Sequence, residues 1–395
     1  MARPGTPKGP RGSELLDVYT KDVTSKDLTR VFTRDALDAY RAFTHRLDPA
    51  DFEGLKGPKR VTAEVRAFLI AFGLKLSPAR RLVFGVALLL AVFGFVRHFS
   101  GLDVQPSDHV HHVVGYGGWT LLASIALLTL LVVLEVADRL SLKNDLEIAR
   151  GIQLAMLPSD TVTVPGVDVF GMSKPANTVG GDFYDIRPLA NGRLLIAVGD
   201  VAGKGSPAAL LMALFLAMER VLLDELTDLV PLTTRLNSQI VRQAPGTRFI
   251  TLFVGSYEPA TGHLDYVNAG HPPALIRRQD GEWENLTEGG MALGLFEAAT
   301  YVLGTATLGP GDIFAAYSDG ITEAEHHERG YFEEAGLQRA LTGARNLPAA
   351  DICRAVFGDV RTFTDEGRLG DDLTILVMRR NQTDEAPDLK VQGSI

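Results

Sequence analysis

Four short acidic motifs in the C-terminal half of the chain contain the side chains most able to do chemistry. They are Gly-Gly-Asp-Phe-Tyr-Asp at residues 180–185, Gly-Asp-Val-Ala-Gly-Lys-Gly at 199–205, Ser-Asp-Gly at 318–320 and Gly-Asp-Asp at 370–372. A single Asp-Gly pair is usually a turn, but each of these motifs adjoins an apolar run typical of a buried strand. Clustered carboxylates suit hard divalent cations such as Mg²⁺ or Mn²⁺. The pattern therefore predicts a metal site where the strand ends meet.

The stretch around Asp200 makes a metal or phosphate site plausible on its own. The apolar run at 194–198 places Asp200 at a strand end, and two nearby glycines allow a tight turn. Ser206 and Pro207 are typical of an N-cap and first turn of a helix. A nucleotide-binding P-loop is rejected, because the glycine spacing is too short and Gly, not Ser or Thr, follows Lys204.

In order and spacing, the motifs resemble the metal-dependent protein phosphatases of the PPM class (protein phosphatase 2C-like), in their bacterial SpoIIE/RsbU branch. The resemblance covers residues 144–379 and includes Leu-Glu-Ile-Ala-Arg-Gly-Ile-Gln at 146–153 and Asn-Ala-Gly-His-Pro-Pro at 268–273. It implies an αββα sandwich with two Mn²⁺ or Mg²⁺ ions. The expected activity is hydrolysis of phosphoserine or phosphothreonine on a cytoplasmic regulatory protein, such as an anti-sigma-factor antagonist.

The resemblance also suggests which groups hold the ions. Asp200 is expected to bridge both cations. The other expected ligands are the side chains of Asp182, Asp319 and Asp371 and the carbonyl oxygen of Val201. Two such ions can activate a water and stabilise the phosphoryl group that it attacks.

Several neighbouring residues have weaker or different expected roles. Asp372 stands where many relatives have Asn, so it is expected to orient a ligand or water. Lys204 is the nearest cation that could contact phosphate, because the Arg of eukaryotic relatives has no recognisable counterpart. Ala202 replaces their proton-donating His, so no general acid is identified. Asp185 is read as a turn or supporting residue, and His271 as part of a hairpin turn.

The elements that must position these motifs follow from hydrophobic periodicity. Strands are expected at 167–172, 181–187, 193–201, 248–257, 262–268, 273–277, 301–308, 313–318 and 373–378, and helices at 207–226, 229–242, 336–341 and 349–363. A hairpin is expected at 251–268. This mixture predicts an α+β domain at 159–380 with two sheets between helical layers, followed by a disordered tail at 381–395.

A two-helix transmembrane hairpin is expected before this domain, at residues 81–136. Its spans are predicted at about 82–98 and 113–134, since about 20 apolar residues cross a bilayer and flanking arginines can extend the shorter run. Basic residues outside the hairpin outnumber the single Arg97 in the loop between the spans. This asymmetry predicts a multi-pass protein of the inner (cell) membrane with a cytoplasmic N-terminus and catalytic domain. The loop histidines, at 98, 109, 111 and 112, are read as polar rather than metal-binding.

The remaining segments are expected to be regulatory or unstructured. Residues 1–12 read as a disordered tail and 13–80 as a helical N-terminal segment without recognisable chemistry. Residues 137–158 are expected to form a helical or coiled-coil linker that pairs two subunits into a homodimer. Leu142, Leu146 and Ile152 lie on its apolar side. In the alternative reading, this helix packs only on the phosphatase core.

Composition excludes some classes of function. Two alternatives to a phosphatase remain to be considered. A net charge of −9 and a pI near 5.5 argue against a nucleic-acid partner, and the single Cys353 excludes an internal disulfide. Residues 180–183 faintly resemble a diguanylate cyclase signature, but the expected Glu is absent. A degenerate, non-enzymatic membrane scaffold is the other alternative. The retained carboxylates argue against it, because like charges brought together are costly without a cation.

Overall fold

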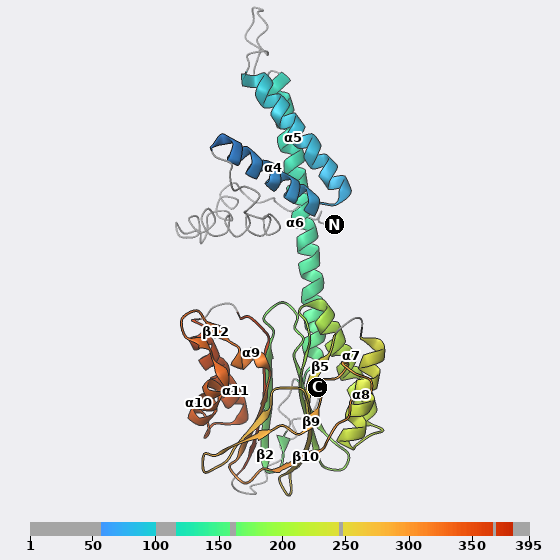
Figure 1. The fold of residues 1–395 in the computed structure, drawn as a ribbon, viewed down its shortest axis with the longest axis vertical. Helices are drawn as coiled ribbons and strands as arrows, with labels where there is room; N and C mark the ends of the chain where they lie inside the picture. Colours follow the sequence, from blue (N-terminus) through green and yellow to red (C-terminus); the bar gives the residue numbers. More distant parts are fainter. Residues whose placement is uncertain (1–56, 100–115, 159–162, 245–247, 366–368, 382–395) are drawn as a thin grey trace, which may run out of the picture. The chain divides into compact units, whose positions relative to one another are not determined.

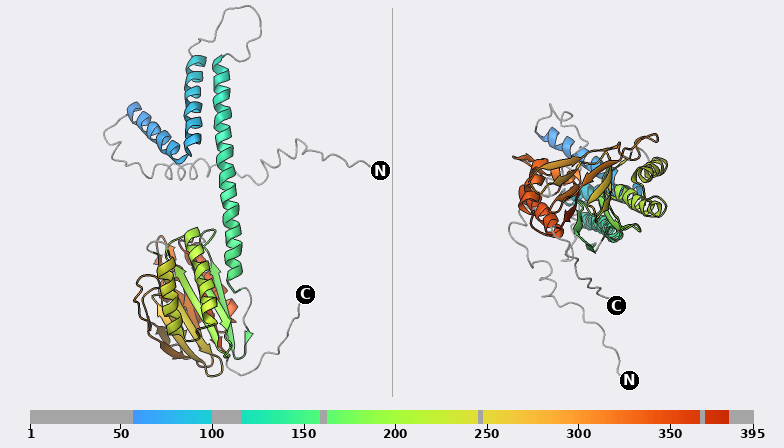
Figure 2. Two further views of the ribbon diagram at one scale, coloured as in Figure 1. Left: turned by 90° about the vertical axis from the view of Figure 1, so that its right-hand side faces the viewer. Right: turned by 90° about the horizontal axis from the view of Figure 1, so that it is seen from below.

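A computed structural model describes residues 57–99, 116–158, 163–244, 248–365 and 369–381. The chain divides into two compact units, residues 1–140 and 141–395 (Figures 1 and 2). Helix α6 (Tyr116–Met156) begins in the first unit and ends in the second. Of the segments expected at the termini, residues 1–56 and 382–395 lie outside the described residues.

Two sheets form the centre of the second unit. The strand order is β1-β2-β14-β11-β7-β8 in one sheet and β10-β6-β5-β4-β3 in the other, with β9 pairing beside β6. The first sheet contains β1 (Thr163–Val164), β2 (Val167–Lys174), β7 (Ala274–Arg277), β8 (Trp283–Leu286), β11 (Ile313–Tyr317) and β14 (Leu373–Arg380). The second contains β3 (Phe183–Pro188), β4 (Leu194–Val201), β5 (Ile250–Glu258), β6 (His263–Ala269), β9 (Gly289–Gly290) and β10 (Gly304–Thr307). A separate ribbon pairs β12 (Glu325–His326) with β13 (Gly330–Tyr331).

Helices cover the outer face of each sheet. α7 (Ser206–Leu223) and α8 (Leu229–Gln243) pack on the sheet that contains β4, while α10 (Glu333–Gly343) and α11 (Ala349–Phe363) lie on the other side (Figure 1). The short helix α9 (Asp319–Thr322) follows β11. The layers are helix, sheet, sheet, helix, and the predicted α+β class and αββα sandwich are confirmed.

Burial on both faces explains the apolar runs that predict the central strands. β4 is buried along Leu194 to Gly199, because one of its faces meets the opposite sheet and the other lies under α7. Between the sheets, the ring centroids of Phe253 and Phe314 are 5.6 Å apart. By contrast, α8 buries one stripe at helical spacing, which includes Leu232, Leu236 and Ile240.

The predicted strands and helices of this domain all have observed counterparts, with one notable difference at α7. Ser206 is the first helical residue, and the N-cap position belongs to Gly205 at φ 76°. Serine would be strained in this left-handed conformation, whereas glycine adopts it readily. The sequence did not predict β1, β8, β9, β12, β13 or α9, because two to four residues show too little periodicity.

The first unit contains α4 (Pro58–Lys75), α5 (Pro78–Phe99) and the beginning of α6. α5 and α6 lie side by side (Figure 2), where the buried Ser124 hydroxyl donates a hydrogen bond to the carbonyl of the buried Ala87 at 2.8 Å. Large apolar side chains instead point outward, and Leu89 is 73% exposed. Small residues between helices and large apolar residues outside are typical of membrane helices.

Three segments among the described residues are long and apolar enough to cross a membrane: residues 78–97, 118–156 and 206–223. The first two overlap the expected spans, which makes them compatible with a membrane hairpin. The third is α7, which packs on a sheet of the second unit. Its apolar composition is therefore explained by burial within the protein.

Candidate metal centre

The predicted site aspartates lie at one end of the sandwich, contributed by both sheets. Asp182 immediately precedes β3, and Asp200 is the penultimate residue of β4. From the other sheet, Asp319 opens α9 just after β11, while Asp371 lies two residues before β14. Antiparallel pairing of β3 with β4 and of β11 with β14 brings these strand ends together.

Asp182 is the most deeply buried of these carboxylates, at 4% exposure. Its Oδ2 atom has no hydrogen-bond partner among the described residues. Burial is the largest cause that raises its pKa well above the ordinary value, followed by the charge of Asp200, while the Ser318 hydroxyl acts in the opposite direction. An acceptor buried without a partner is costly, and a bound cation would remove that cost.

Asp200 and Asp319 lie close enough to influence each other. Burial, and then the charge of Asp319, raises the pKa of Asp200 to about 6. Burial also raises the pKa of Asp319. A Cβ on Gly181 would lie 3.1 Å from Asp200 Oδ1 and 2.9 Å from the carbonyl oxygen of Val201. Both predicted oxygen donors therefore face the same glycine backbone.

Asp371 is paired with the predicted phosphate-binding lysine. Lys204 Nζ lies 2.8 Å from Asp371 Oδ2 and donates a hydrogen bond of 2.8 Å to the carbonyl of Gly370. The Asp371 hydrogen bond is the largest cause that raises the pKa of Lys204. The ammonium group thus supplies positive charge at an edge of the acidic cluster.

Asp372 has a different environment from its neighbour. Its Oδ1 accepts a hydrogen bond from the Ala176 amide at 2.8 Å, and its Oδ2 accepts one from the Gly181 amide at 2.7 Å. A Cβ on Gly180 would lie 2.1 Å from Oδ2, so only glycine fits there. Both carboxylate oxygens are therefore used to hold the loop that presents Asp182.

Gln153, near the end of α6, is a supporting residue that sequence reasoning missed. Its side-chain amide donates a hydrogen bond to the Gly180 carbonyl at 2.7 Å, and its Oε1 accepts one from the Gly180 amide at 3.3 Å. The residue is 5% exposed. A glutamine on an otherwise apolar side of the predicted helix was the sequence signal that could have identified it. Gln153 and Asp372 thus hold adjacent residues of the same loop.

Arg248 is a second missed candidate, because it reads as the start of an ordinary strand. The Ala202 amide donates a hydrogen bond to the Phe249 carbonyl at 2.9 Å, which brings this segment beside the loop after β4. Arg248 Nε lies 3.8 Å from the position that a Cβ on Gly203 would take. Within the described part of the chain, no ion pair engages its guanidinium.

His271 has the environment of a structural residue. Its amide donates a hydrogen bond to Asn268 Oδ1 at 2.8 Å, and Asn268 Nδ2 donates one to the His271 carbonyl at 3.0 Å. Burial lowers the pKa of His271 to about 3, so the ring is neutral. The loop histidines 109, 111 and 112 lie outside the described residues, as does the side chain of His98.

Another group with suitable metal-ligand types consists of His326, His327 and Asp365. His326 Nε2 pairs with Asp365 Oδ2 at 2.8 Å, and its Nδ1 accepts hydrogen bonds from two backbone amides at 3.0 Å. Both ring nitrogens are thus already engaged. The aspartate cluster provides the better cation site, since it offers several carboxylates and an unpartnered buried oxygen.

Comparisons with known proteins identify the family of this domain. Residues 190–381 match the family model described as Stage II sporulation protein E (SpoIIE). The chain is 29% identical over 244 residues to the phosphoserine phosphatase RsbU of Bacillus subtilis. This alignment covers 60% of this chain and 71% of RsbU. It is 28% identical over 278 residues to the protein IcfG of Synechocystis sp., covering 64% of this chain and 44% of IcfG.

A solved structure gives the same answer for the fold. The SiaA-PP2C domain of Pseudomonas aeruginosa superposes with a TM-score of 0.56 and 24% identity, over 62% of this chain and 98% of that domain. The predicted family and class of enzyme are confirmed. The second unit therefore contains a domain that matches the SpoIIE family model, is homologous to RsbU and shares its sandwich fold with a PP2C domain.

Proposed function

We propose that this protein is a membrane-tethered phosphatase that hydrolyses phosphoserine or phosphothreonine on a cytoplasmic regulatory protein. The observation that carries the proposal is the gathering of four strand-end aspartates around a buried, unpartnered carboxylate oxygen of Asp182. RsbU and RsbP of Bacillus subtilis, with which the chain shares this region, are named phosphoserine phosphatases. The family resemblance suggests a phosphorylated anti-sigma-factor antagonist as the substrate.

The donor set fits two Mg²⁺ or Mn²⁺ ions, because it consists of carboxylate and carbonyl oxygens. In this proposal, Asp200 would be a ligand of both ions. The remaining ligands are Asp182, Asp319, Asp371 and the Val201 carbonyl. When bound, two such ions lower the pKa of a water and stabilise charge on the phosphoryl group.

The chain's own cations would complete phosphate recognition. Lys204 is held at the cluster by Asp371, and Arg248 lies beside the loop that follows Asp200. A guanidinium can bind two phosphate oxygens at once, whereas an ammonium acts as a point charge. Arg248 is therefore the proposed counterpart of the phosphate-binding Arg that the sequence lacks at its usual place.

The positioning of Asp182 is proposed to depend on helix α6. Gln153 holds Gly180 and Asp372 holds Gly181, so a displacement of the helix end would move the loop before Asp182. We propose that α6 pairs with its copy in a homodimer and that pairing controls the competence of the site. Changing Leu146 and Ile152 to Asp should then yield monomers with altered turnover. An unchanged oligomer with unchanged turnover would contradict the coupling.

The membrane part of the proposal is supported by the composition and packing of the first unit. Two helices have the required length and hydropathy, and their mutual contact uses the small residues Ala87 and Ser124. The basic flanks favour a cytoplasmic location for both termini. Alkaline extraction of cell membranes should leave the full chain in the pellet, and release into the supernatant would contradict membrane spanning.

The activity can be tested on the full chain in detergent or nanodiscs. Phosphate release from p-nitrophenyl phosphate and from a phosphoserine peptide should require Mn²⁺ or Mg²⁺ and stop on addition of EDTA. Absence of turnover with each divalent ion, in a folded dimer, would favour the non-enzymatic scaffold. Chromatography of products from GTP tests the diguanylate cyclase alternative, and a cyclic dinucleotide product would overturn the proposal.

A further inference from the structure

The 291–296 loop of the second unit, between β9 and β10, exposes three large apolar side chains. Met291 is 50% exposed, Leu295 42% and Phe296 58%. An apolar side chain left in water forfeits the free energy that burial provides, and exposed apolar residues that gather in one place commonly mark interaction sites. Aromatic residues and methionine are enriched at protein–protein interfaces. The composition of the loop is therefore that of a protein contact surface.

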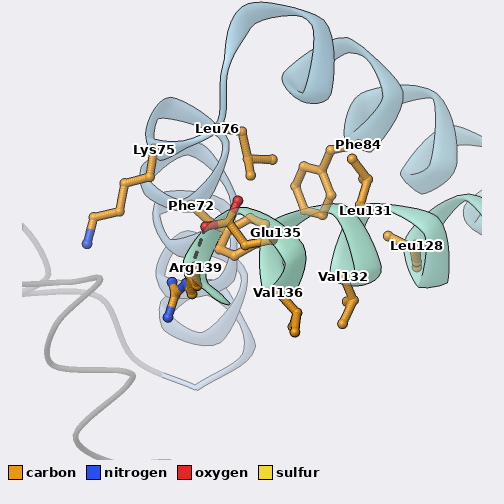
Figure 3. Close-up of a pocket in the computed structure, with 10 residues that line it drawn as sticks. All are labelled: Phe72, Lys75, Leu76, Phe84, Leu128, Leu131, Val132, Glu135, Val136 and Arg139. Atoms are coloured by element: carbon orange, nitrogen blue, oxygen red, sulfur yellow. Dashed lines mark hydrogen bonds and ion pairs between the residues drawn. The ribbon is translucent and has the colours of Figure 1, made fainter. Parts of the chain in front are cut away.

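The apolar surface of the first unit has a different explanation. There, a pocket of about 510 Å³ lies between α4, α5 and α6, with apolar walls that include Phe72, Phe84 and Leu131 (Figure 3). Glu135 at its charged end pairs with Arg139 at 3.4 Å. In the proposed topology, lipid covers such apolar surface. The phosphatase domain is expected to face water, so lipid does not account for the 291–296 loop.

The fold holds this loop firmly in its exposed position. Leu293, near its centre, is fully buried, and its amide and carbonyl form hydrogen bonds of 2.8 and 2.9 Å with the backbone of Ile250. Asn237 of α8 is also fully buried. Its side chain accepts a hydrogen bond from the Gly294 amide at 2.8 Å and donates one to the Phe296 carbonyl at 2.9 Å. The exposed side chains are thus presented by an anchored backbone, and a preformed surface loses little entropy on binding.

The loop lies at the same end of the sandwich as the proposed metal centre. Ile250 pairs on one side with Val201, whose carbonyl is a proposed ligand, and on the other side with Leu293. Two strand spacings, roughly 10 Å, therefore separate Val201 from Leu293. A protein interface covers about 800 Å² of each partner, which corresponds to a disc with a radius of roughly 16 Å. A folded protein that brings a phosphoserine to the metal centre is therefore large enough to cover the loop.

We propose that the 291–296 loop is a docking surface for the phosphorylated protein substrate, with Met291, Leu295 and Phe296 contacting an apolar patch beside its phosphoserine. This inference rests on the proposed function and concerns the part of the substrate that the metal centre does not contact. The ions and Arg248 bind the phosphate group, which all phosphoproteins share. The loop binds the protein surface next to it. The substrate class is therefore a folded protein rather than an unstructured phosphopeptide.

The first experiment identifies the substrate from the phosphorylation sites that accumulate in cells whose own copy of the protein carries Asp200→Asn. Cells that carry Leu295→Asp should accumulate the same sites. Leu347→Asp is the matched control, because Leu347 is 43% exposed, against 42% for Leu295. Its carbonyl accepts a hydrogen bond from Arg379, at the opposite end of β14 from Asp371. Cells with this control variant should match the wild type.

Purified full-length variants in nanodiscs then separate docking from catalysis. The probes are the phosphoprotein identified in cells and a short peptide around its phosphoserine. For the wild type, kcat/KM should be about thirtyfold higher for the protein than for the peptide, the contribution of one interface hot spot. Leu295→Asp should remove this preference, as should the milder variant Phe296→Ser, whereas Leu347→Asp should keep it. Turnover of p-nitrophenyl phosphate, measured in parallel, reports the integrity of the metal centre in each variant.

Each contrary result has a distinct meaning. Equal kcat/KM for protein and peptide in the wild type, or equal preference in the Leu295 and Leu347 variants, would overturn the docking surface while the phosphatase activity stands. A lower oligomeric mass for Leu295→Asp than for Leu347→Asp would show that a second copy of the chain covers the loop, which would also overturn the proposal. If no phosphorylation site rises in the Asp200→Asn cells, the proposed function itself fails.

Discussion

The two units of the chain differ in how many of their large apolar side chains they bury. In the phosphatase unit, Phe215, Phe253 and Tyr257 are fully buried. In the first unit, the contact between α5 and α6 buries Ala87 and Ser124, while Leu89 is 73% exposed. Water drives large apolar side chains inward, whereas lipid does not, so close packing of small residues takes over. If the first unit lies in lipid as proposed, the same residue type reports a different environment in each unit.

Helix α7 shows how far composition alone can mislead. It passes the same length and hydropathy criteria as the two expected spans. However, 39% of its residues are buried, against 11% of an 18-residue window in each of the other two segments. Packing on a sheet, rather than apolar content, distinguishes a core helix from a candidate span.

The largest effect should come from the site that only the second unit carries. Asp200→Asn should lower kcat about a thousandfold or more, since loss of the proposed bridging charge removes several kcal/mol of stabilisation. The measurement is Mn²⁺-dependent hydrolysis of p-nitrophenyl phosphate by the full chain. Asp372→Asn is the matched control and should be milder, because its carboxylate holds backbone amides. Equal damage from both would contradict the division of roles.

The opposite burial of the two units can be tested by removing one large side chain from each. Phe253→Ala should destabilise the second unit by about 3–5 kcal/mol, as expected for a buried aromatic residue. Leu89→Ala in the first unit should change stability by less than about 0.5 kcal/mol. Trp283 lies in β8 and Trp119 in α6, so single-tryptophan variants report urea unfolding of each unit separately. Comparable losses would refute the lipid-facing position of Leu89.

A pH test addresses the buried acid of α7. Burial, and then the charge of Asp185, raises the pKa of Glu219 from 4.5 to about 8. Between these values the folded state keeps a proton that the unfolded state releases. Its contribution to stability is therefore lost as pH rises, at up to about 1.4 kcal/mol per pH unit. Glu219→Gln removes this titration. The free energy of unfolding of the variant should therefore rise relative to that of the wild type from about pH 5 to 8. A constant difference in unfolding free energy would contradict the shift.

Gln153 tests whether the end of α6 positions the metal site. Gln153→Ala should weaken apparent Mn²⁺ affinity about tenfold, the lower end of effects seen for residues that orient metal ligands. Isothermal titration with Mn²⁺ measures this without substrate. Arg150→Ala, at an exposed residue three positions earlier in α6, should leave affinity unchanged. Equal Mn²⁺ affinity in the wild type and the Gln153 variant would contradict a role of Gln153 in positioning the metal site.

The smallest effect is expected at Arg248. Arg248→Ala should raise KM for a phosphopeptide about fivefold, roughly one charge-assisted hydrogen bond, with Mn²⁺ affinity unaltered. Arg242→Ala is a control on an exposed α8 residue that pairs with Glu297. A change in kcat alone, with KM unaffected, would argue against phosphate contact.

The sequence predicts the sandwich well because its central strands carry long apolar runs and its helices a clear stripe. It also locates the aspartates, since each follows or precedes such a strand. The roles of Gln153 and Arg248 could not be predicted in the same way, because both depend on backbone groups that only the fold brings close. Gln153 at least interrupts an apolar helical side, whereas Arg248 is not unusual in its segment. Likewise, the N-cap at Gly205 depends on a backbone angle, which composition does not encode.

The place of β14 in its sheet has a consequence for biosynthesis. Although it is the last strand along the described chain, it lies between β2 and β11, and Leu373 pairs with Lys174. Until residues 373–380 have been synthesised, β2 and β11 lack the partner that joins them, and Asp371 is missing from the cluster. Pairing across such a distance is slow, because a long loop must close first. The apolar helices of the first unit leave the ribosome much earlier. In the proposed topology, a nascent chain can thus reach the membrane before it can assemble the site.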